Sequence, residues 1–389
     1  MMPEETLRAL PDPVQRHFAR LEGYVVRVIA KHIGGTLGRA TTTDTHRMME
    51  LQRMGANLRH IDAEIARTVG LAERDVQRIM QEASRREYRG VAAHARAWDS
   101  PLPPHEANRN LQRLVEQASR ATAGTFANIS DSRAVGMVDR MGQVRPLPDF
   151  YREFIDYAVL KSRMGMEDWN IITRNTVRDM ADGGLRRLAW ASGYTQRVDT
   201  SVRRNVLGGL ARLSLEQAEM LAEEIGADGM EITWHDGYRP SHDFGGRQVT
   251  MLEWRTNYRL RLMEPNCYHR AFAIILGVST PAYTDDWIAE RRAANERKFT
   301  IDNMTFNRYK AEQAQRRFEA EIRESKQRVS AFEASGHKKD AMEERYALAR
   351  TESAYLSFSE KAGLPVRPNR VWEWGGDASW PRFAGYPYR

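Results

Sequence analysis

Apolar residues recur at intervals of three or four along most of the chain, and this spacing constrains the fold more than any other feature. In the first hundred residues it predicts three helices. Their apolar stripes are Val14, Phe18, Leu21, Val25 and Ile29; Met48, Leu51, Met54, Leu58, Ile61 and Ile65; and Val76, Ile79 and Ala83. Gly34-Gly35 ends the first helix, and the proline-rich residues 99–104 stop the third because proline has no amide donor. We therefore predict a helical N-terminal region over residues 1–100, followed by a linker.

Helical spacing continues on both sides of the chain's centre. A middle helical region is predicted over residues 105–213. Over residues 286–364 two helices flank Gly336, with apolar stripes at Phe318, Ile322, Val329 and Phe332 and at Met342, Tyr346, Ala349 and Leu356. Charges of both signs fill the other faces, which predicts an antiparallel helical hairpin that forms a solvated arm for contacting other subunits. Residues 365–389 form an irregular tail that either wraps over a neighbour or packs on its own chain.

The stretch of residues 214–285 has a different pattern. Ser214 and Gln217 read as a capping box that starts a helix, which ends at Gly226. Apolar and polar residues then alternate over 230–235, as in a half-buried strand, and residues 248–252 predict a second strand. The predicted fold is therefore mainly α with a small β-rich module (α+β): a helical N-terminal region, a central compact β module and a C-terminal antiparallel helical hairpin.

Composition excludes several classes of protein. With 389 residues, 41% hydrophobic and 29% charged, the chain has the composition of an ordinary soluble protein of several domains. Its longest apolar run, residues 271–278, is far shorter than the roughly 20 residues that span a bilayer. No secretory signal is visible, and the single cysteine, Cys267, excludes an internal disulfide framework, so we expect assembly in a reducing cytoplasm. A net charge of +7 fits a place near nucleic acid but, with 52 acidic residues among 59 basic ones, predicts no dedicated binding groove.

Polar chemistry is concentrated in residues 235–248, HDGYRPSHDFGGRQ, and in the segment around Cys267. His235, His242, Cys267 and His269 are the only histidines and cysteine between residues 106 and 336. Imidazole and thiolate are the ligands of structural zinc, so these residues form a candidate zinc site whose metal ion would cross-link and stabilise a small module. The alternative is that the histidines make ordinary hydrogen bonds and the thiol is a small buried apolar group. The spacing leaves both interpretations open.

The same residues also allow catalytic arrangements. His235 with Asp236 or Asp243 could act as a general base, Cys267 with His269 as a nucleophile pair, and a Cys/His metal centre as a nuclease. However, the sequence contains no phosphate-cradling glycine-rich loop, no serine nucleophile elbow and no paired cysteine knuckle. We therefore predict that the chain is not an enzyme and assign no catalytic or cofactor-binding residue.

The sequence resembles the phage minor capsid protein 2 family, which is related to the Mu-type head morphogenesis proteins. The resemblance covers roughly residues 45 to 371 and is strongest between 203 and 330. The first matching signature consists of Arg203, Arg204, Gly226-Ala227-Asp228, His235, Gly237, Arg239-Pro240-Ser241-His242, Gly246 and Arg247. The second consists of Asn266-Cys267-Tyr268-His269 followed by Gly277-Val278-Ser279, with Tyr268 in place of the family's arginine.

Membership of this family implies a low-copy structural component of the virion, close to the portal inside the head, that aids head assembly, DNA packaging or ejection. It implies the portal protein, the major capsid protein or both as partners within a large assembly, with packaged DNA nearby and no membrane. The protein would be made in the cytoplasm of the bacterial host and reside in the phage head. The alternative is a metal-dependent nuclease or toxin-like enzyme domain carried by a phage head protein.

Overall fold

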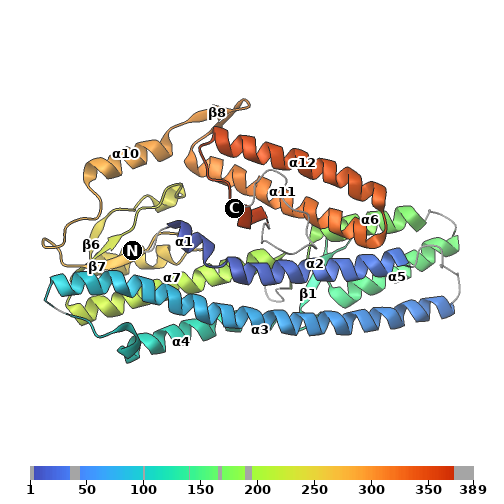
Figure 1. Ribbon diagram of the computed structural model, residues 1–389, viewed down its shortest axis with the longest axis horizontal. Coiled ribbons are helices and arrows are strands. Elements are labelled where there is room, and N and C mark those ends of the chain that lie inside the picture. Colours follow the sequence, from blue (N-terminus) through green and yellow to red (C-terminus); the bar gives the residue numbers. More distant parts are fainter. Residues whose placement is uncertain are drawn as a thin grey trace. The chain divides into compact units, whose positions relative to one another are not determined.

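The computed structural model describes residues 4–35, 44–99, 101–139, 141–164, 169–188 and 195–371 (Figure 1). Helices make up 71% of the structure, and the strands form small antiparallel sheets of two to four strands. The predicted class, mainly α with a small β-rich module, is therefore confirmed. No helix in the described ranges is long and apolar enough to span a membrane.

The chain folds into two compact units, each assembled from segments that are far apart in sequence. The first unit comprises Met1–Val14, Ala72–Thr125 and Arg203–Gln313, and the second comprises Gln15–Leu71, Phe126–Val202 and Ala314–Arg389. The two units group residues that are close in space, not successive along the chain. They therefore do not test the predicted division into five successive regions, which stays a prediction.

The first unit combines helices with two small sheets. Its helices are α1 (Glu4–Ala9), the second half of α3 (Asp44–Ala97), α4 (Arg109–Gly124), most of α7 (Val198–Ile225), α8 (Met251–Glu253), α9 (Arg259–Leu262) and α10 (Asp285–Glu296). A π-helical turn, Trp254–Tyr258, joins α8 to α9. The strands β5 (Gly229–Ile232), β6 (Gln248–Thr250) and β7 (Ala271–Ile274) form one sheet, and β8 (Phe299–Ile301) pairs with β9 (Met304–Phe306) in the other.

The second unit contains most of α2 (Asp12–Gly35), the first half of α3, and α5 (Leu147–Met164), α6 (Trp169–Gly183), α11 (Arg308–Ser335) and α12 (Lys338–Lys361). Its four-stranded antiparallel sheet has the order β2-β1-β3-β4. The strands are β1 (Val135–Val138), β2 (Val144–Pro146), β3 (Arg186–Arg187) and β4 (Gln196–Arg197). The sequence pattern did not predict this sheet, because β2, β3 and β4 have only two or three residues and β1, with the sequence VGMV, does not alternate apolar and polar residues.

Two predicted helix boundaries are wrong. The second and third predicted helices form one continuous helix of 54 residues, α3. Gly70 lies inside it, since a single glycine weakens a helix without ending it. Likewise α7 runs unbroken through Ser214, so the predicted capping box does not exist. The amide of Gln217 instead donates to the backbone oxygen of Ser84 at 3.0 Å, which ties α7 to α3.

The C-terminal hairpin exists, but it is not a solvated arm. Helices α11 and α12 meet at Gly336, and Ile322, Leu348, Tyr355 and Val371 form their shared core. The apolar stripe predicted for the second helix is wrong in register, because Met342 and Tyr346 are 52% and 67% exposed. Helix α11 also buries polar side chains on other faces, among them Gln315, Glu319, Lys326 and Gln327. The hairpin is therefore part of the core of the second unit.

Gly209 marks a close approach between helices in the first unit. A Cβ atom added there would lie 2.0 Å from Oγ1 of Thr122 on α4 and 2.9 Å from Cε of Met80 on α3. A Cβ atom added at the neighbouring Gly208 meets nothing within 4 Å. Gly209 therefore sets the spacing between α7 and its neighbours, whereas Gly208 does not.

We expect Gly209→Ala to lower the free energy of unfolding of the first unit by roughly 1–3 kcal/mol, because α7 must move away from α4. Gly208→Ala is the matched control and should be neutral or stabilising by up to about 1 kcal/mol, since alanine favours the helix. Urea denaturation of both variants tests this. Equal stability of the two variants would show that the approach at Gly209 is not tight.

Candidate functional site

The central module is built on a three-stranded antiparallel sheet with β5 in the middle. Met230 pairs with Val249 on β6 and with Ala273 on β7. Because β5 has a neighbour on each side, all four of its residues are buried. The strands predicted at residues 230–235 and 248–252 are thus confirmed as β5 and β6, while β7 lies in the apolar run 271–278, which showed no alternating pattern.

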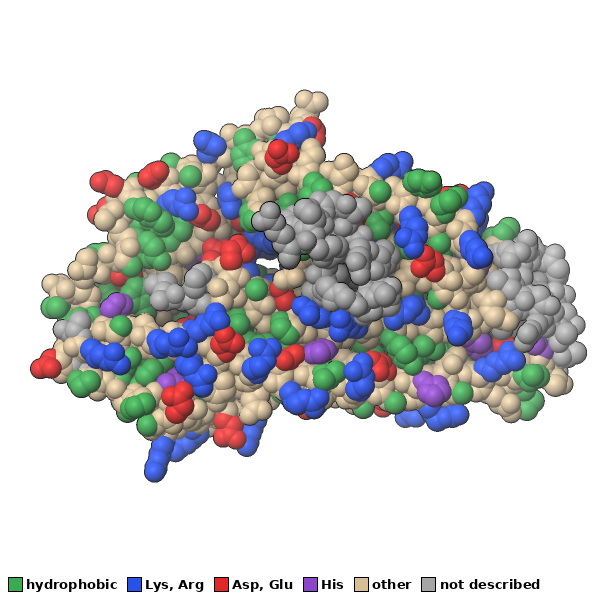
Figure 2. All heavy atoms as spheres, viewed as in Figure 1, with side chains coloured by type: hydrophobic (Ala, Val, Ile, Leu, Met, Phe, Trp, Pro, Cys, Tyr) green, Lys and Arg blue, Asp and Glu red, His purple; other side chains and the backbone are tan. Residues whose placement is uncertain are grey.

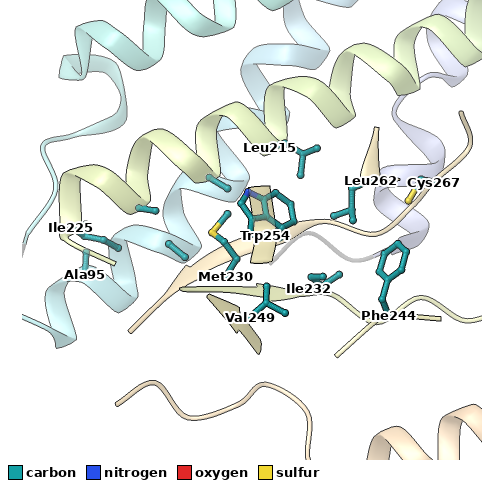
Figure 3. Packing of buried hydrophobic residues seen from close by; sticks show 14 residues of the cluster. Ala95, Leu215, Ile225, Met230, Ile232, Phe244, Val249, Trp254, Leu262 and Cys267 are labelled. Carbon is teal, nitrogen blue, oxygen red and sulfur yellow. The ribbon is translucent and has the colours of Figure 1, made fainter. Parts of the chain in front are cut away.

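One apolar core supports this sheet. It combines residues of α3 and α7 with the three strands and with the segment that follows β6 (Figure 3). Its members are Ala95, Leu215, Ala218, Ala222, Ile225, Met230, Ile232, Phe244, Val249, Trp254, Leu262, Cys267, Ala271 and Ala273. Trp254 is fully buried at its centre, and its indole nitrogen donates to Oε1 of Glu219 at 2.8 Å. This apolar core therefore supports the segments that carry the signature residues.

The two signature glycines are required by backbone shape and by space. Gly237 and Gly246 have φ angles of +69° and +80°, a region that disfavours residues with a side chain. A Cβ atom at Gly237 would lie 2.5 Å from Oε1 of Glu312, and one at Gly246 would lie 2.6 Å from Cδ1 of Ile288. The turn after β5 is therefore packed tightly against α10 and the start of α11.

The structure brings the four predicted zinc ligands together. His269 lies at the centre, with its ring centroid 5.5 Å from that of His235 and 6.2 Å from that of His242. Sγ of Cys267 lies 3.5 Å from Nδ1 of His269. None of the four residues is more than 6% exposed. The histidine cluster, defined as these four residues, is thus a buried group in the module.

The ring nitrogens of His242 and Nδ1 of His235 lie next to groups outside the histidine cluster. For His242, Nδ1 lies 3.0 Å from Oγ of Ser241 and Nε2 lies 3.2 Å from the backbone oxygen of Arg261. Nδ1 of His235 lies 2.9 Å from Oε2 of Glu4. Across the described ranges, no three or more His, Cys, Asp or Glu side chains are arranged to hold a metal ion. A zinc ion at this site stays a prediction, and it would require these side chains to turn.

Burial disfavours the charged forms of His242, His269 and Cys267. It lowers the pKa of His242, and it lowers the pKa of His269 well below the ordinary value, with the neighbouring His235 acting in the same direction. Burial also raises the pKa of the Cys267 thiol. A thiol with a raised pKa is a poor nucleophile, and Nε2 of the neutral His269 has no hydrogen-bond partner among the described residues. These properties suit a packed structural group better than a reactive one.

The carboxylates considered as partners of His235 are engaged elsewhere. Asp236 accepts from the indole nitrogen of Trp234 at 2.7 Å and pairs with Arg291 at 2.7 Å. Asp243 pairs with Arg292 at 3.0 Å. Both carboxylates that could have formed a general-base pair with His235 are therefore engaged with other residues. Of the catalytic pairs, only Cys267 and His269 are close together.

The carboxylate beside His235 is Glu4, at the N-terminus of the described chain. Arg8, one turn along α1, contacts Glu4 at 2.6 Å and Glu312 at 3.4 Å, and its guanidinium lies 4.3 Å from the ring centroid of Tyr268. Tyr268 thus offers Arg8 an aromatic face. Sequence reasoning missed Glu4 and Arg8, because no spacing or motif connects residues more than 200 positions apart.

The arginines of the signature differ in role. Arg203 is buried, donates to Oδ1 of Asp12 at 2.6 Å and to the backbone oxygen of Arg8 at 2.5 Å, and so holds α1 in place. Arg239 pairs with Glu264 at 3.1 Å, and Arg247 approaches the Tyr258 hydroxyl at 3.4 Å. Arg204 is half-buried, with no ion pair or hydrogen bond to any described residue. Three of the four arginines therefore link segments of the module.

The Glu4 contacts give an expected pH dependence. Burial alone would raise the pKa of Glu4, but contact with His235 and the charge of Arg8 lower it from 4.5 to about 2. Since the folded pKa lies below the unfolded value, this stabilisation is complete above about pH 4.5 and is lost as pH falls toward 2. We expect Glu4→Gln to remove about 1–2 kcal/mol of stability at pH 7 and little at pH 2. Urea denaturation across this range measures the difference; a constant difference would contradict it.

Comparison with known proteins supplies the family. Residues 2–358 match the family model described as Phage minor capsid protein 2, which covers nearly the whole chain. No curated protein and no solved structure gives a significant match. The matched range includes α1 and the whole central module. The chain therefore belongs to the phage minor capsid protein 2 family and has a structural role in the phage.

Proposed function

We propose that this protein is a low-copy component of the phage head that docks beside the portal and aids head assembly, DNA packaging or ejection. The observation that carries the proposal is how the signature residues are used. Gly237, Gly246 and Arg203 fix the backbone and α1, and all four residues of the histidine cluster are buried. A group of this kind maintains a shape, and a fixed shape is what docking to a large assembly requires.

The surface charge fits the same role. Basic and acidic side chains are interspersed over the visible face (Figure 2). With a net charge of +7, the protein would partly neutralise nearby phosphate without forming a dedicated nucleic-acid groove. The proposed partners are therefore the portal protein, the major capsid protein or both, with packaged DNA as a non-specific neighbour whose contribution weakens as salt rises.

Quantitative mass spectrometry of purified phage heads tests the proposal. The protein should be present in every preparation, at a ratio to the portal protein that stays constant through density-gradient purification. A matched pair of variants on α7 sharpens the test: Arg203→Met releases α1, whereas Arg212→Met changes an exposed arginine of the same helix. We expect only the first to reduce incorporation. Absence of the protein from mature heads would contradict the proposal and indicate a scaffold or maturation factor.

The enzymatic alternative has a direct test. Purified protein is incubated with supercoiled plasmid and Mg²⁺, Mn²⁺ or Zn²⁺, beside the His242→Ala variant. We expect no cleavage that depends on His242, since both ring nitrogens of this residue already have protein partners. Cleavage by the natural protein that His242→Ala abolishes would establish a metal-dependent nuclease.

Zinc bound at the predicted site is measured in a separate experiment. Elemental analysis of natively purified protein, beside a Cys267→Ser variant, counts bound zinc per chain. A structural zinc ion would give about one equivalent in the natural protein and a clear loss in the variant. Less than about a tenth of an equivalent would rule out the zinc site.

A further inference from the structure

A cavity of about 430 Å³ lies in the first unit, next to the module. It is lined by residues of α1, α3 and α7 and by the strands and loops of the module. Thr280 and Ala282 line it and are exposed, so the cavity opens to solvent at this rim. Its volume is in the range of sites that hold a small molecule or the end of a peptide.

Most of the lining is apolar. Trp234, Tyr268, Phe272 and Tyr283 contribute aromatic side chains, and Leu7, Val91, Ala218 and Leu221 contribute aliphatic ones. Trp234 and Tyr283 both pack against Trp287, with ring centroids 5.6 and 5.0 Å from it. The walls of the cavity are therefore suited to an aromatic or aliphatic group.

One cation lies among these apolar walls. Arg270 lines the cavity yet is only 7% exposed. Its Nη1 atom donates to the backbone oxygen of His269 at 2.8 Å, but Nε and Nη2 have no hydrogen-bond partner in the described part of the chain. Burial lowers its pKa, although a guanidinium keeps its proton near neutral pH. A buried cation with unused donors is costly unless an anion completes it.

The acidic residues of the lining form no ion pair with Arg270 within 4 Å. Glu4 is occupied by Arg8 and His235. The charge of Glu87 raises the pKa of Arg270, but burial raises the pKa of Glu87 itself. The Oε1 atom of Gln217, also in the lining, lacks a hydrogen-bond partner among the described residues. The lining thus combines apolar walls with two residues, Arg270 and Gln217, whose buried polar atoms lack partners in the described part of the chain.

We propose that this cavity binds a carboxylate attached to an aromatic or aliphatic group, with the planar guanidinium of Arg270 receiving the carboxylate and the aromatic walls receiving the side group. Arginine presents parallel N–H donors that match the two oxygens of a carboxylate. Such a ligand has two sources, the C-terminal residue of another protein chain or a free carboxylic acid. The proposal goes beyond the structural role and does not depend on where in the head the protein lies.

Isothermal titration of the full-length protein tests the charge requirement. The probes are N-acetylphenylalanine, its uncharged amide and phenylacetate, together with the tetrapeptide Ala-Ala-Ala-Phe with a free C-terminus. We expect both N-acetylphenylalanine and the tetrapeptide to bind, and the amide to bind at least about tenfold more weakly. Tighter binding of the tetrapeptide identifies a chain end as the source, whereas tighter binding of phenylacetate identifies a free acid. Equal affinity for the acid and its amide would overturn the proposal.

Variants locate the binding in the cavity. Thr280→Trp fills the exposed rim, and Thr305→Trp, at an exposed position on β9, is the matched control. We expect only the first to reduce affinity. Arg270→Lys keeps the positive charge but loses the parallel N–H donors of the guanidinium, so it should weaken binding. Arg270→Gln removes the charge and should therefore remove the preference for the acid over the amide. Circular dichroism checks that the variants fold. Thr280→Trp still tests the cavity if Arg270→Gln fails to fold. Full binding by Thr280→Trp would contradict the assignment.

Discussion

Replacing Trp254 with alanine is expected to lower the free energy of unfolding of the first unit by about 4 kcal/mol. The side chain is fully buried at the centre of the core beneath β5, β6 and β7. Its removal leaves a large cavity and takes away the hydrogen bond to Glu219, which Arg259 continues to hold at 2.8 Å. This core also supports the segment 235–247 between β5 and β6. The backbone amides of the histidine cluster should therefore become more exposed to solvent in the variant.

Hydrogen–deuterium exchange measured by mass spectrometry resolves this effect by segment. In Trp254→Ala, peptides from β5, β7 and the C-terminal half of α7 should lose protection, while peptides from α12 should not. Trp287→Ala on α10 is the matched control, since this tryptophan is only partly buried, and its effect should be much smaller. Unchanged protection of β5 in Trp254→Ala would contradict the assignment of this core.

Replacing Arg197 with methionine is expected to destabilise the second unit by about 3–5 kcal/mol. Arg197 contacts Glu22 at 2.8 Å and Glu324 at 3.1 Å, and the Glu22 side chain has no exposed surface. Removing the guanidinium therefore leaves a buried carboxylate unpaired. Its charge can be relieved only by taking up a proton.

The pH dependence and a rescue identify the cause. Burial raises the pKa of Glu22, and Arg197 opposes this, so the pKa should rise further in Arg197→Met. A folded pKa above the unfolded value means that stability falls as pH rises through that window, so the variant should be least impaired at low pH. Adding Glu22→Leu should restore part of the stability. Arg152→Met, at an exposed position on α5, should have little effect. Equal destabilisation at all pH values would contradict this explanation.

The sequence was sufficient to predict the fold class and the longest elements. Helical spacing located α2, α11 and α12, and alternation located β5, because these patterns extend over enough residues to be distinctive. It could not predict that α3 is continuous, because local signals resemble those of two capped helices. Nor did it predict the register of α12, where Tyr346 is exposed while Glu352 is buried. The buried face of α12 carries Leu348 and Tyr355 together with Glu352, which lies 3.6 Å from the buried Lys326 of α11.

The candidate site was predictable in its members but not in its geometry. Residue type and sequence proximity singled out the histidine cluster, and the structure brings its four side chains together. The orientation of each ring is set by groups that local sequence does not connect to it, such as Glu4 for His235 and the backbone of Arg261 for His242. For the same reason the cavity beside Arg270 could not be foreseen, since its lining comes from segments far apart in the chain.

The most direct test of the structural role is a cryo-electron microscopy reconstruction of intact phage heads without imposed icosahedral symmetry, since averaging would remove a low-copy protein. We expect density that fits the first unit, with its three-stranded sheet packed on α7, in contact with the portal or the inner capsid surface. If heads shown by mass spectrometry to contain the protein had no density that fits either compact unit, at the portal vertex or on the inner capsid surface, this placement would be contradicted.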